Sequence, residues 1–328
     1  MLSLSRTESS EQFVNLLKTV VGSFPPKKLP LQEAIEWAVD LQLAHDLDVV
    51  TDGEQRTDMI NYFKSLPGLG TKPSGPYVKS RIMPFERPEA FSKLQDLQYV
   101  RGYLKSKDRE DVQVKVSITG PITLGFACAC NGVEHYSGMR DMRLYSDFAS
   151  ALKPLATAIA KTGCYVQVDE PSLSIRVMEA SQAVKIVNEV LSGVPSTAYD
   201  EGKLVVHVCG SLNKPLFEDL MSLDAPALSL AFGAPTVKGN LEAISKLSLQ
   251  GHRKKLGVGC VSVQAKTKED VDALDVVIQR LNMIGDKVGE EQIAFVHPDC
   301  GMRGTCEDAV EPILERVAKS AEYWEKRP

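Results

Sequence analysis

The sequence predicts an α/β fold, a single-domain (β/α)8 TIM barrel in which eight parallel strands close into a cylinder surrounded by helices. Short runs rich in β-branched residues recur eight times along the 328 residues. Most are followed by a longer segment in which apolar residues recur every three or four positions, the spacing of an amphipathic helix. Strands that alternate with helices indicate βαβ units, and eight such units in roughly 300 residues fit a closed barrel.

The expected elements follow one another in the order that a barrel requires. The expected strands are short and apolar, and they lie at residues 18–21, 48–51, 112–118, 165–168, 204–208, 228–231, 256–260 and 294–296. The expected helices carry the three- and four-residue apolar spacing, and they lie at residues 31–45, 140–162, 175–191, 214–222, 268–284 and 306–324. Pro25, Pro26, Pro84 and Pro88 fall between elements, where a fixed φ and a missing N–H do least harm.

No internal repeat or break in composition marks a second domain. We therefore expect residues 1–328 to form one barrel, with residues 1–16 as a short N-terminal helical extension. Residues 66–87 contain four prolines and three glycines, and this segment is too long for a plain connection. We expect it to be a loop excursion over the barrel mouth or an oligomer contact.

The composition indicates a folded cytoplasmic protein with a small ligand. Lys and Arg number 38 and Asp and Glu 43, for a net charge of −5, so no basic field attracts nucleic acid or an anionic membrane. No apolar run approaches the roughly 20 residues that span a bilayer, and the first residues lack the apolar core of a signal peptide. Seven cysteines, an odd number, favour free thiols, metal ligands or reactive thiols over a disulfide framework.

Potential metal ligands follow two of the expected strands. His207 and Cys209 are two residues apart, so in an extended segment both side chains point to the same side. Cys300 follows the last expected strand, and all strands of a barrel end at one face, where Cys300 could approach the other two. Two thiolates and one imidazole form a known catalytic zinc set. A His-x-Cys pair alone more often packs in a core, so the coincidence with Cys300 carries the prediction.

Polar residues follow other strands in the same way. Glu54 follows the second expected strand, Asp169 the fourth, and Ser23 lies in the turn after the first. Each acid could instead be a helix cap or an ordinary loop charge. Acids and metal ligands on several strand ends nevertheless favour one shared polar site.

Six motifs occur in the order found in a known family. They are VGSFP at 21–25, DGEQR at 52–56, TGPIT at 119–123, VDEP at 168–171, HVC at 207–209 and HPDCG at 297–301. On these motifs the chain, from about residue 17 to 325, resembles the catalytic C-terminal barrel of cobalamin-independent methionine synthase. The resemblance implies a zinc-dependent methyl transfer to the thiol of L-homocysteine, giving L-methionine.

By this resemblance His207, Cys209 and Cys300 correspond to zinc ligands. Ser23, Glu54 and Asp169 match positions that in the family hold the carboxylate and amino groups of homocysteine. Zinc lowers the pKa of a bound thiol, so its sulfur becomes a nucleophile at neutral pH. The two carboxylates would hold the substrate ammonium through charge-assisted hydrogen bonds.

The chain also departs from the family pattern. The family enzyme has an extra N-terminal barrel that helps to hold a folate donor, for which this chain has no room. Gln264 stands where the family has a histidine that assists folate protonation. We therefore expect a methylcorrinoid donor, either methylcobalamin or a corrinoid carrier protein, as in the short core methionine synthases that the chain also resembles. Ala231 aligns with a glutamate, the family's fourth zinc ligand, so either zinc keeps three protein ligands and an open site, or the alignment is shifted, or the residue was substituted.

Two other functions fit the same residues. A related barrel could methylate or alkylate another thiol such as coenzyme M, whose sulfonate gives no role to an ammonium pocket. An inactive barrel could instead bind a corrinoid carrier as a subunit, and Ala231 would then mark lost chemistry.

Four other cysteines and two arginines have less specific contexts. Cys128, Cys130 and Cys164 are expected in the core, and Cys260 is a candidate substitute ligand. Arg56 and Arg303 follow site motifs, where they would bind a carboxylate or face solvent.

Overall fold

The computed structural model describes residues 16–327, so the expected N-terminal extension lies outside it except for Leu16. Eight parallel strands form one sheet in the order β1-β10-β9-β8-β7-β6-β5-β2. A parallel bridge between Thr19 and Val49 joins the two edges of this sheet, which closes it into the predicted (β/α)8 barrel. The strands are β1 (Leu17–Lys18), β2 (Val49–Val50), β5 (Gln113–Thr119), β6 (Tyr165–Asp169), β7 (Leu204–Val208), β8 (Ala227–Ala231), β9 (Lys255–Val261) and β10 (Ile293–Pro298).

All eight expected strands are present; the strand at 204–208 has the expected ends, and one or both ends of the other seven are shifted by one to a few residues. The first was expected at 18–21, but the ladder of β1 covers only Leu17–Lys18. The carbonyl groups of Val20 and Val21 instead accept hydrogen bonds from the side chains of Lys115 and Gln167. The chain thus leaves the sheet early because polar side chains inside the barrel take over its backbone partners.

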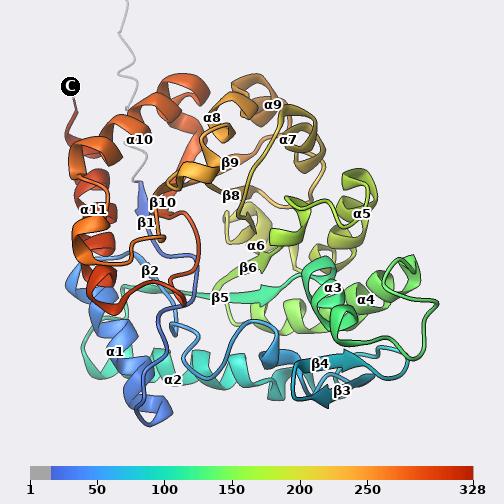
Figure 1. The fold of residues 1–328 in the computed structure, drawn as a ribbon. Coiled ribbons are helices and arrows are strands. Elements are labelled where there is room, and N and C mark those ends of the chain that lie inside the picture. The colour runs from blue at the N-terminus through green and yellow to red at the C-terminus, as the bar shows by residue number, and fades with distance from the viewer. Residues whose placement is uncertain (1–15, 328) are drawn as a thin grey trace, which may run out of the picture.

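Helices surround the strands (Figure 1). Those at the expected places are α1 (Leu31–Ala44), α4 (Met142–Ala160), α5 (Ala180–Leu191), α7 (Lys214–Leu220), α10 (Leu274–Val288) and α11 (Glu307–Lys326). The helix expected from residue 268 begins later, because a capping box between Thr267 and Asp270 closes a separate 3-10 turn first. Among the described residues, no helix is both long and apolar enough to cross a membrane.

Five helices were not predicted. They are α2 (Ser92–Ser106), α3 (Pro121–Asn131), α6 (Ser196–Asp200), α8 (Asn240–Ala243) and α9 (Lys246–Gly251). The helix α2 is weakly amphipathic because its buried face includes two charged residues, Lys93 and Asp96. This mixture hides the apolar spacing by which a helix is recognised in a sequence.

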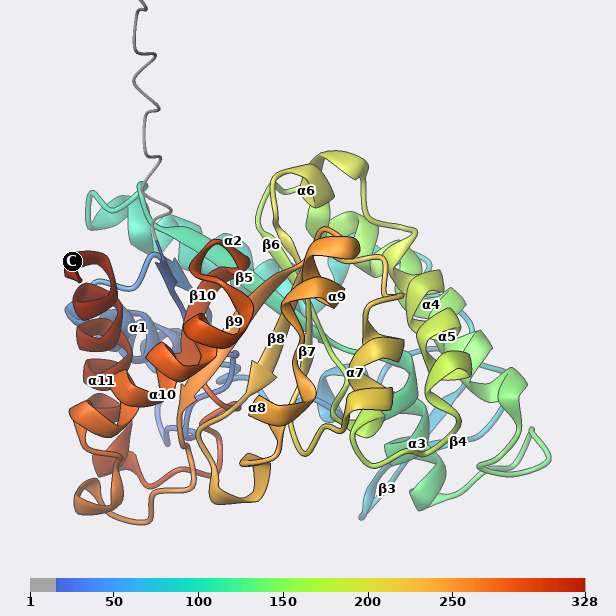
Figure 2. The ribbon, with the colours of Figure 1, turned by 90° about the horizontal axis from the view of Figure 1, so that it is seen from above.

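The segment expected as a loop excursion contains a hairpin. Its antiparallel strands are β3 (Leu69–Lys72) and β4 (Gly75–Val78). Val78 exchanges backbone hydrogen bonds with Gly132 and Glu134, so the hairpin is fixed to the chain that follows α3. Figure 2 shows it beside α3, at the periphery of the barrel.

The barrel interior is apolar at one end and polar at the other. Near the strand beginnings, one layer of side chains forms its own apolar cluster, consisting of Val49, Tyr165, Val205, Ala227 and Phe295. Two residues further along three of these strands stand Gln167, His207 and Ser229, all of them buried. Side chains two apart on a strand share a face, so the apolar layer closes the bottom of the barrel and the polar layers face its C-terminal mouth.

Candidate metal centre

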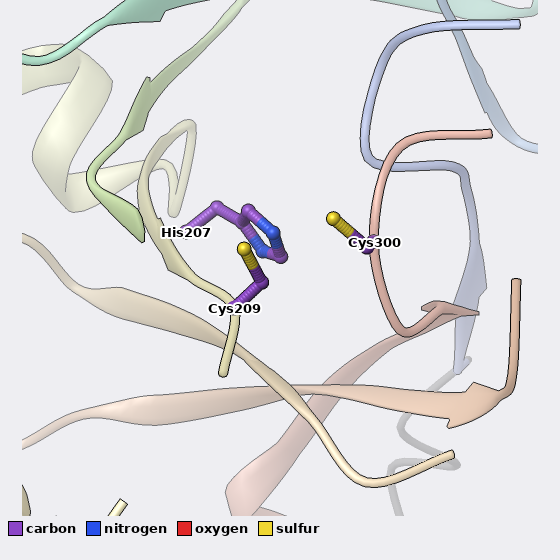
Figure 3. A group of neighbouring side chains, drawn as sticks. All are labelled: His207, Cys209 and Cys300. Atoms are coloured by element: carbon purple, nitrogen blue, oxygen red, sulfur yellow. The ribbon is translucent and has the colours of Figure 1, made fainter. Parts of the chain in front are cut away.

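The three residues predicted as metal ligands come together at the C-terminal mouth of the barrel. His207 ends β7 with Val208, Cys209 follows directly, and Cys300 lies in the loop after β10. One ring nitrogen of His207 and the two cysteine sulfurs all lie within 4.8 Å of one another. In Figure 3 the Cys300 side chain points toward His207 and Cys209 from the opposite side of the site.

The loop that carries Cys300 is held by hydrogen bonds on both sides of the cysteine. The Asp299 carboxylate accepts from the backbone N–H groups of Ala234, at 2.7 Å, and Val263, at 3.0 Å. Beyond the cysteine, the N–H of Met302 donates to the carbonyl of Ser23 at 2.7 Å. The loops after β8, β9 and β1 therefore fix the position of a sulfur that no local pattern could place.

His207 presents an unused ligand atom to this site. Its Nδ1 lies 2.8 Å from the hydroxyl of Ser229. Its Nε2 is buried and has no hydrogen-bond partner among residues 16–327. A buried polar atom without a partner is costly, and a divalent cation bound beside two sulfurs would satisfy it. The donor set and the unsatisfied nitrogen both fit zinc.

The two thiols are not equivalent. A hydrogen bond toward Cys300, with burial, raises the pKa of Cys209 above its ordinary value. The same hydrogen bond and the nearby His207 hold the pKa of Cys300 below its ordinary value. One sulfur is therefore already biased toward the thiolate, the form that binds a metal.

Ala231 brings no ligand to the site. It is buried and packs in a small apolar cluster with Ala234 and Val237, next to Cys209. Among the described residues no fourth His, Cys, Asp or Glu joins the three ligand atoms. The residues thus offer three donors, the number typical of a catalytic zinc site that keeps one position open.

Glu54 is buried next to a positive charge on another element. Its Oε1 accepts from Nζ of Lys93 at 2.6 Å and from the hydroxyl of Ser117 at 3.0 Å. Lys93 also lies over the ring of Tyr62, 4.2 Å from its centre. Burial opposes the charge of Lys93, but the carboxylates of Glu54 and Asp52 raise its pKa above the ordinary value. The predicted substrate contact Glu54 is therefore already neutralised by the protein.

Asp169 is the second predicted carboxylate and is paired differently. The parallel register sets it beside His207 on the neighbouring strand. Its Oδ1 accepts from Nε2 of Gln167 at 2.7 Å, and among the described residues it forms no ion pair. Burial raises its pKa to about 6. Asp169 is thus a buried carboxylate at this mouth whose charge is not neutralised by an ion pair among the described residues.

Ser23 lies against the loop of Cys300. A Cβ on Gly301 would fall 2.3 Å from the Ser23 hydroxyl oxygen, so a larger residue at 301 would displace that hydroxyl from its position. Gly22 lies next to the residues around Glu54, because a Cβ added to Gly22 would lie 3.1 Å from the Ser117 hydroxyl oxygen. The turn after β1 therefore bridges the metal ligands and Glu54.

Several other residues singled out in the sequence lie away from the ligands. Cys260 is fully buried, with its sulfur 4.0 Å from the hydroxyl of Ser320 on α11, so it points away from the barrel interior. Arg56 donates to both carboxylate oxygens of Asp96. Arg303 donates to the backbone carbonyls of Glu54 and Thr57, so it ties two site loops together.

The prediction that Cys130 is a core residue was wrong, although Cys128 and Cys164 are buried as expected. Cys130 is exposed near the end of α3. Residues two apart on a helix lie on nearly opposite faces, so only one of the pair Cys128 and Cys130 can face the core.

Five polar residues that are buried around the site were not predicted as site residues, although His297 belongs to the motif HPDCG; they are Lys93, Ser117, Gln167, Ser229 and His297. Three of these, Ser117, Gln167 and His297, stand two residues from another buried polar residue on the same strand or just beyond it, whereas Ser229 stands between Ala227 and Ala231. Polar residues at period two inside apolar strands are the signal that could have found these three. Lys93 has no such signal, because it lies on α2.

The comparisons with known protein sequences agree with each other. The family model described as "Cobalamin-independent synthase, Catalytic domain" matches residues 6–323. A methionine synthase from Methanothermobacter marburgensis is 31% identical over 327 residues, covering 93% of this chain and 99% of that protein. A methionine synthase from Methanocaldococcus jannaschii is 28% identical over 302 residues, covering 90% of this chain and 89% of that protein.

Solved structures share the fold. A B12-independent methionine synthase from Shewanella sp. W3-18-1, in complex with selenomethionine, has a TM-score of 0.72 and 18% identity, over 95% of this chain and 98% of that chain. A methyltransferase from Methanosarcina mazei has a TM-score of 0.61 and 15% identity, over 94% of each chain. At these identities the likeness concerns the fold alone.

Proposed function

This chain belongs to the family of cobalamin-independent synthase catalytic domains, and from that premise we propose that it is a zinc-dependent enzyme that methylates the thiol of L-homocysteine to give L-methionine. Membership of this family makes the chain a methyltransferase of the methionine synthase type. The proposal adds the metal, the acceptor and the residues that hold them.

The observation that carries the proposal is the group of His207, Cys209 and Cys300, with ligand atoms within 4.8 Å of one another and Nε2 of His207 buried without a partner. These three residues would hold the zinc ion. When bound, zinc lowers the pKa of a substrate thiol so that its sulfur is a nucleophile at neutral pH. Because residues 16–327 supply three donors to this group, the acceptor sulfur would have a place to bind.

The polar residues around these ligands support an amino acid as the acceptor. Asp169 forms no ion pair among the described residues and lies beside His207, so we assign it to the substrate ammonium. Glu54, already paired with Lys93, would add to the negative field rather than carry the ammonium alone. Ser23, which lies against the Cys300 loop, would donate its hydroxyl to the substrate carboxylate. The negative sulfonate of a thiol such as coenzyme M would be repelled by these carboxylates.

The expected methylcorrinoid donor gains no support from the comparisons. The family is described as cobalamin-independent, and that description argues against a cobalamin cofactor and against a corrinoid protein as partner. Gln264, expected to stand where the family has a histidine, is exposed. The experiment below therefore compares two methyl donors.

The experiment measures metal content and methionine formation on the same protein. Purified chain is analysed for zinc and then supplied with homocysteine and either methylcobalamin or methyltetrahydrofolate, with coenzyme M as an alternative acceptor. We expect bound zinc and methionine formation with at least one donor, and no product from coenzyme M. Zinc-free protein, or methylation of coenzyme M with no methionine, would contradict the proposal. Turnover with methyltetrahydrofolate and none with methylcobalamin would exclude methylcobalamin as the donor.

A further inference from the structure

A row of hydrogen bonds crosses the barrel interior behind the ligand His207. Its Nδ1 lies 2.8 Å from the hydroxyl oxygen of Ser229, and that oxygen lies 2.9 Å from Nε2 of His297. At the far end, Nδ1 of His297 lies 2.7 Å from the carbonyl oxygen of Pro298. The row therefore runs from β7 through β8 to β10, and all three side chains in it are buried.

The carbonyl at the end and a neutral His297 ring together set the direction of each bond in the row. A carbonyl oxygen only accepts, so Nδ1 of His297 must carry a proton. His297 is 1% exposed and faces no carboxylate in this row, and burial lowers its pKa to about 3, so the ring is neutral. Its Nε2 then has only a lone pair and accepts the proton of the Ser229 hydroxyl.

The direction of the Ser229 hydrogen bond sets the position of the proton on His207. Because the Ser229 hydroxyl donates to His297, its oxygen is left to accept from Nδ1–H of His207. A neutral His207 with its proton on Nδ1 has a lone pair on Nε2, the buried atom without a partner. The opposite tautomer would place an N–H group at Nε2, and an N–H cannot bind a metal.

A glycine between the two outer strands makes the row possible. The strand β9 lies between β8 and β10, and Gly257 pairs in register with Ser229. A Cβ at this position would lie only 3.0 Å from Nε2 of His297 and 3.3 Å from Cα of Ser229. The missing side chain lets the His297 ring pass over β9 and reach Ser229.

We propose that Ser229 and His297 are positioning residues that hold His207 in the tautomer whose Nε2 lone pair faces Cys209 and Cys300. The inference rests on the proposed function, because it gives that lone pair to a divalent zinc-like cation. Hydrogen bonds behind a metal-binding histidine commonly change metal affinity by roughly 10- to 100-fold when they are removed.

The first test needs no metal. Nitrogen-15 spectra of the metal-free protein report which ring nitrogen of His207 carries the proton. We expect Nδ1–H in the wild type and in Ser229→Thr, which keeps the hydroxyl, and a mixture of tautomers in Ser229→Ala. A wild-type His207 protonated on Nε2, or an unchanged tautomer in Ser229→Ala, would overturn the inference.

The second test measures zinc affinity by competition with a chromophoric chelator at fixed pH. We expect Ser229→Ala and His297→Phe to bind zinc roughly 10- to 100-fold more weakly than wild type, and Ser229→Thr to stay close to it. Ser320→Ala is the matched control, because Ser320 is an equally buried serine that donates to a helix carbonyl on α11.

The outcomes separate the two proposals. A folded wild type that binds no zinc contradicts the proposed function, and the tautomer spectra still decide the inference. A wild type that binds zinc with the same affinity as Ser229→Ala contradicts the inference and leaves the proposed function in place. Gly257→Ala removes no polar group, so weakened zinc binding in this variant would support the role of the His297 ring position. Unchanged zinc affinity and tautomer in Gly257→Ala would contradict that role.

Discussion

The Lys93 ammonium lies 2.6 Å from the Glu54 carboxylate, and the two side chains are only 2% and 8% exposed. One partner comes from the loop after β2 and the other from α2. An ion pair buried to this degree costs desolvation on both sides, so each charge depends on the other.

We expect Lys93→Met to destabilise the protein by about 3–5 kcal/mol, because it leaves the Glu54 carboxylate buried without its cation. The double variant Lys93→Met with Glu54→Gln should regain part of this loss, since no lone charge remains. Urea unfolding measures all three free energies. The control is Lys153→Met, which breaks a 3.1 Å pair with Glu189 whose side chains are 39% and 47% exposed, and which should cost no more than about 1 kcal/mol. Equal losses for Lys93→Met and Lys153→Met would contradict the prediction.

Asp169→Asn should raise the KM for homocysteine by roughly 10- to 100-fold, because a charge-assisted hydrogen bond to the ammonium contributes about 1.5–3 kcal/mol. The comparison substrate is 4-mercaptobutyrate, which is homocysteine without its amino group. Wild type should strongly prefer homocysteine, and Asp169→Asn should lose that preference. Steady-state kinetics with both thiols provide the measurement. If the variant keeps the full preference, another group binds the ammonium.

Cys209→Ser and Cys300→Ser should each reduce bound zinc from about one ion per chain to a small fraction, because a hydroxyl replaces a thiolate ligand. Cys260→Ser should keep its zinc, since Cys260 is buried but points toward α11. Elemental analysis after dialysis against a weak chelator compares the three variants. Zinc retained by both Cys209→Ser and Cys300→Ser would place the metal elsewhere.

Glu170 makes the stability of the protein depend on pH, with greater stability at low pH. Its carboxylate is fully buried at the start of α3, where it accepts from the N–H groups of Ile122 and Thr123, and burial raises its pKa from 4.5 to about 7. The folded state therefore binds a proton more tightly than the unfolded state. This contribution to stability is complete below pH 4.5 and is lost as the pH rises through 7.

We expect the free energy of unfolding of wild type, relative to Glu170→Gln, to rise as the pH falls from about 7.5 to 4.5, by on the order of 3 kcal/mol. Urea unfolding of both proteins across this range measures the difference. Parallel pH profiles for the two proteins would show that the pKa of Glu170 does not differ between the folded and the unfolded state.

Much of the fold could be predicted because each barrel unit has a local pattern. The strand of residues 204–208 was predicted with its observed ends, and α1 was predicted to within one residue. Period two and period 3.6 are properties of the chain itself, so they are visible before folding. The helix α2 was missed because its buried face contains Lys93 and Asp96, and nothing local explains why charges should be buried there.

The site divides in the same way. The sequence by itself determined that His207 and Cys209 share a side of one strand, because that follows from backbone geometry alone. Only the tertiary structure decided that Cys300 reaches them, that Lys93 neutralises Glu54, and that Ser229 and His297 stand behind His207. These contacts join segments far apart in the chain, and barrel closure and strand register, rather than local spacing, set the distances between them.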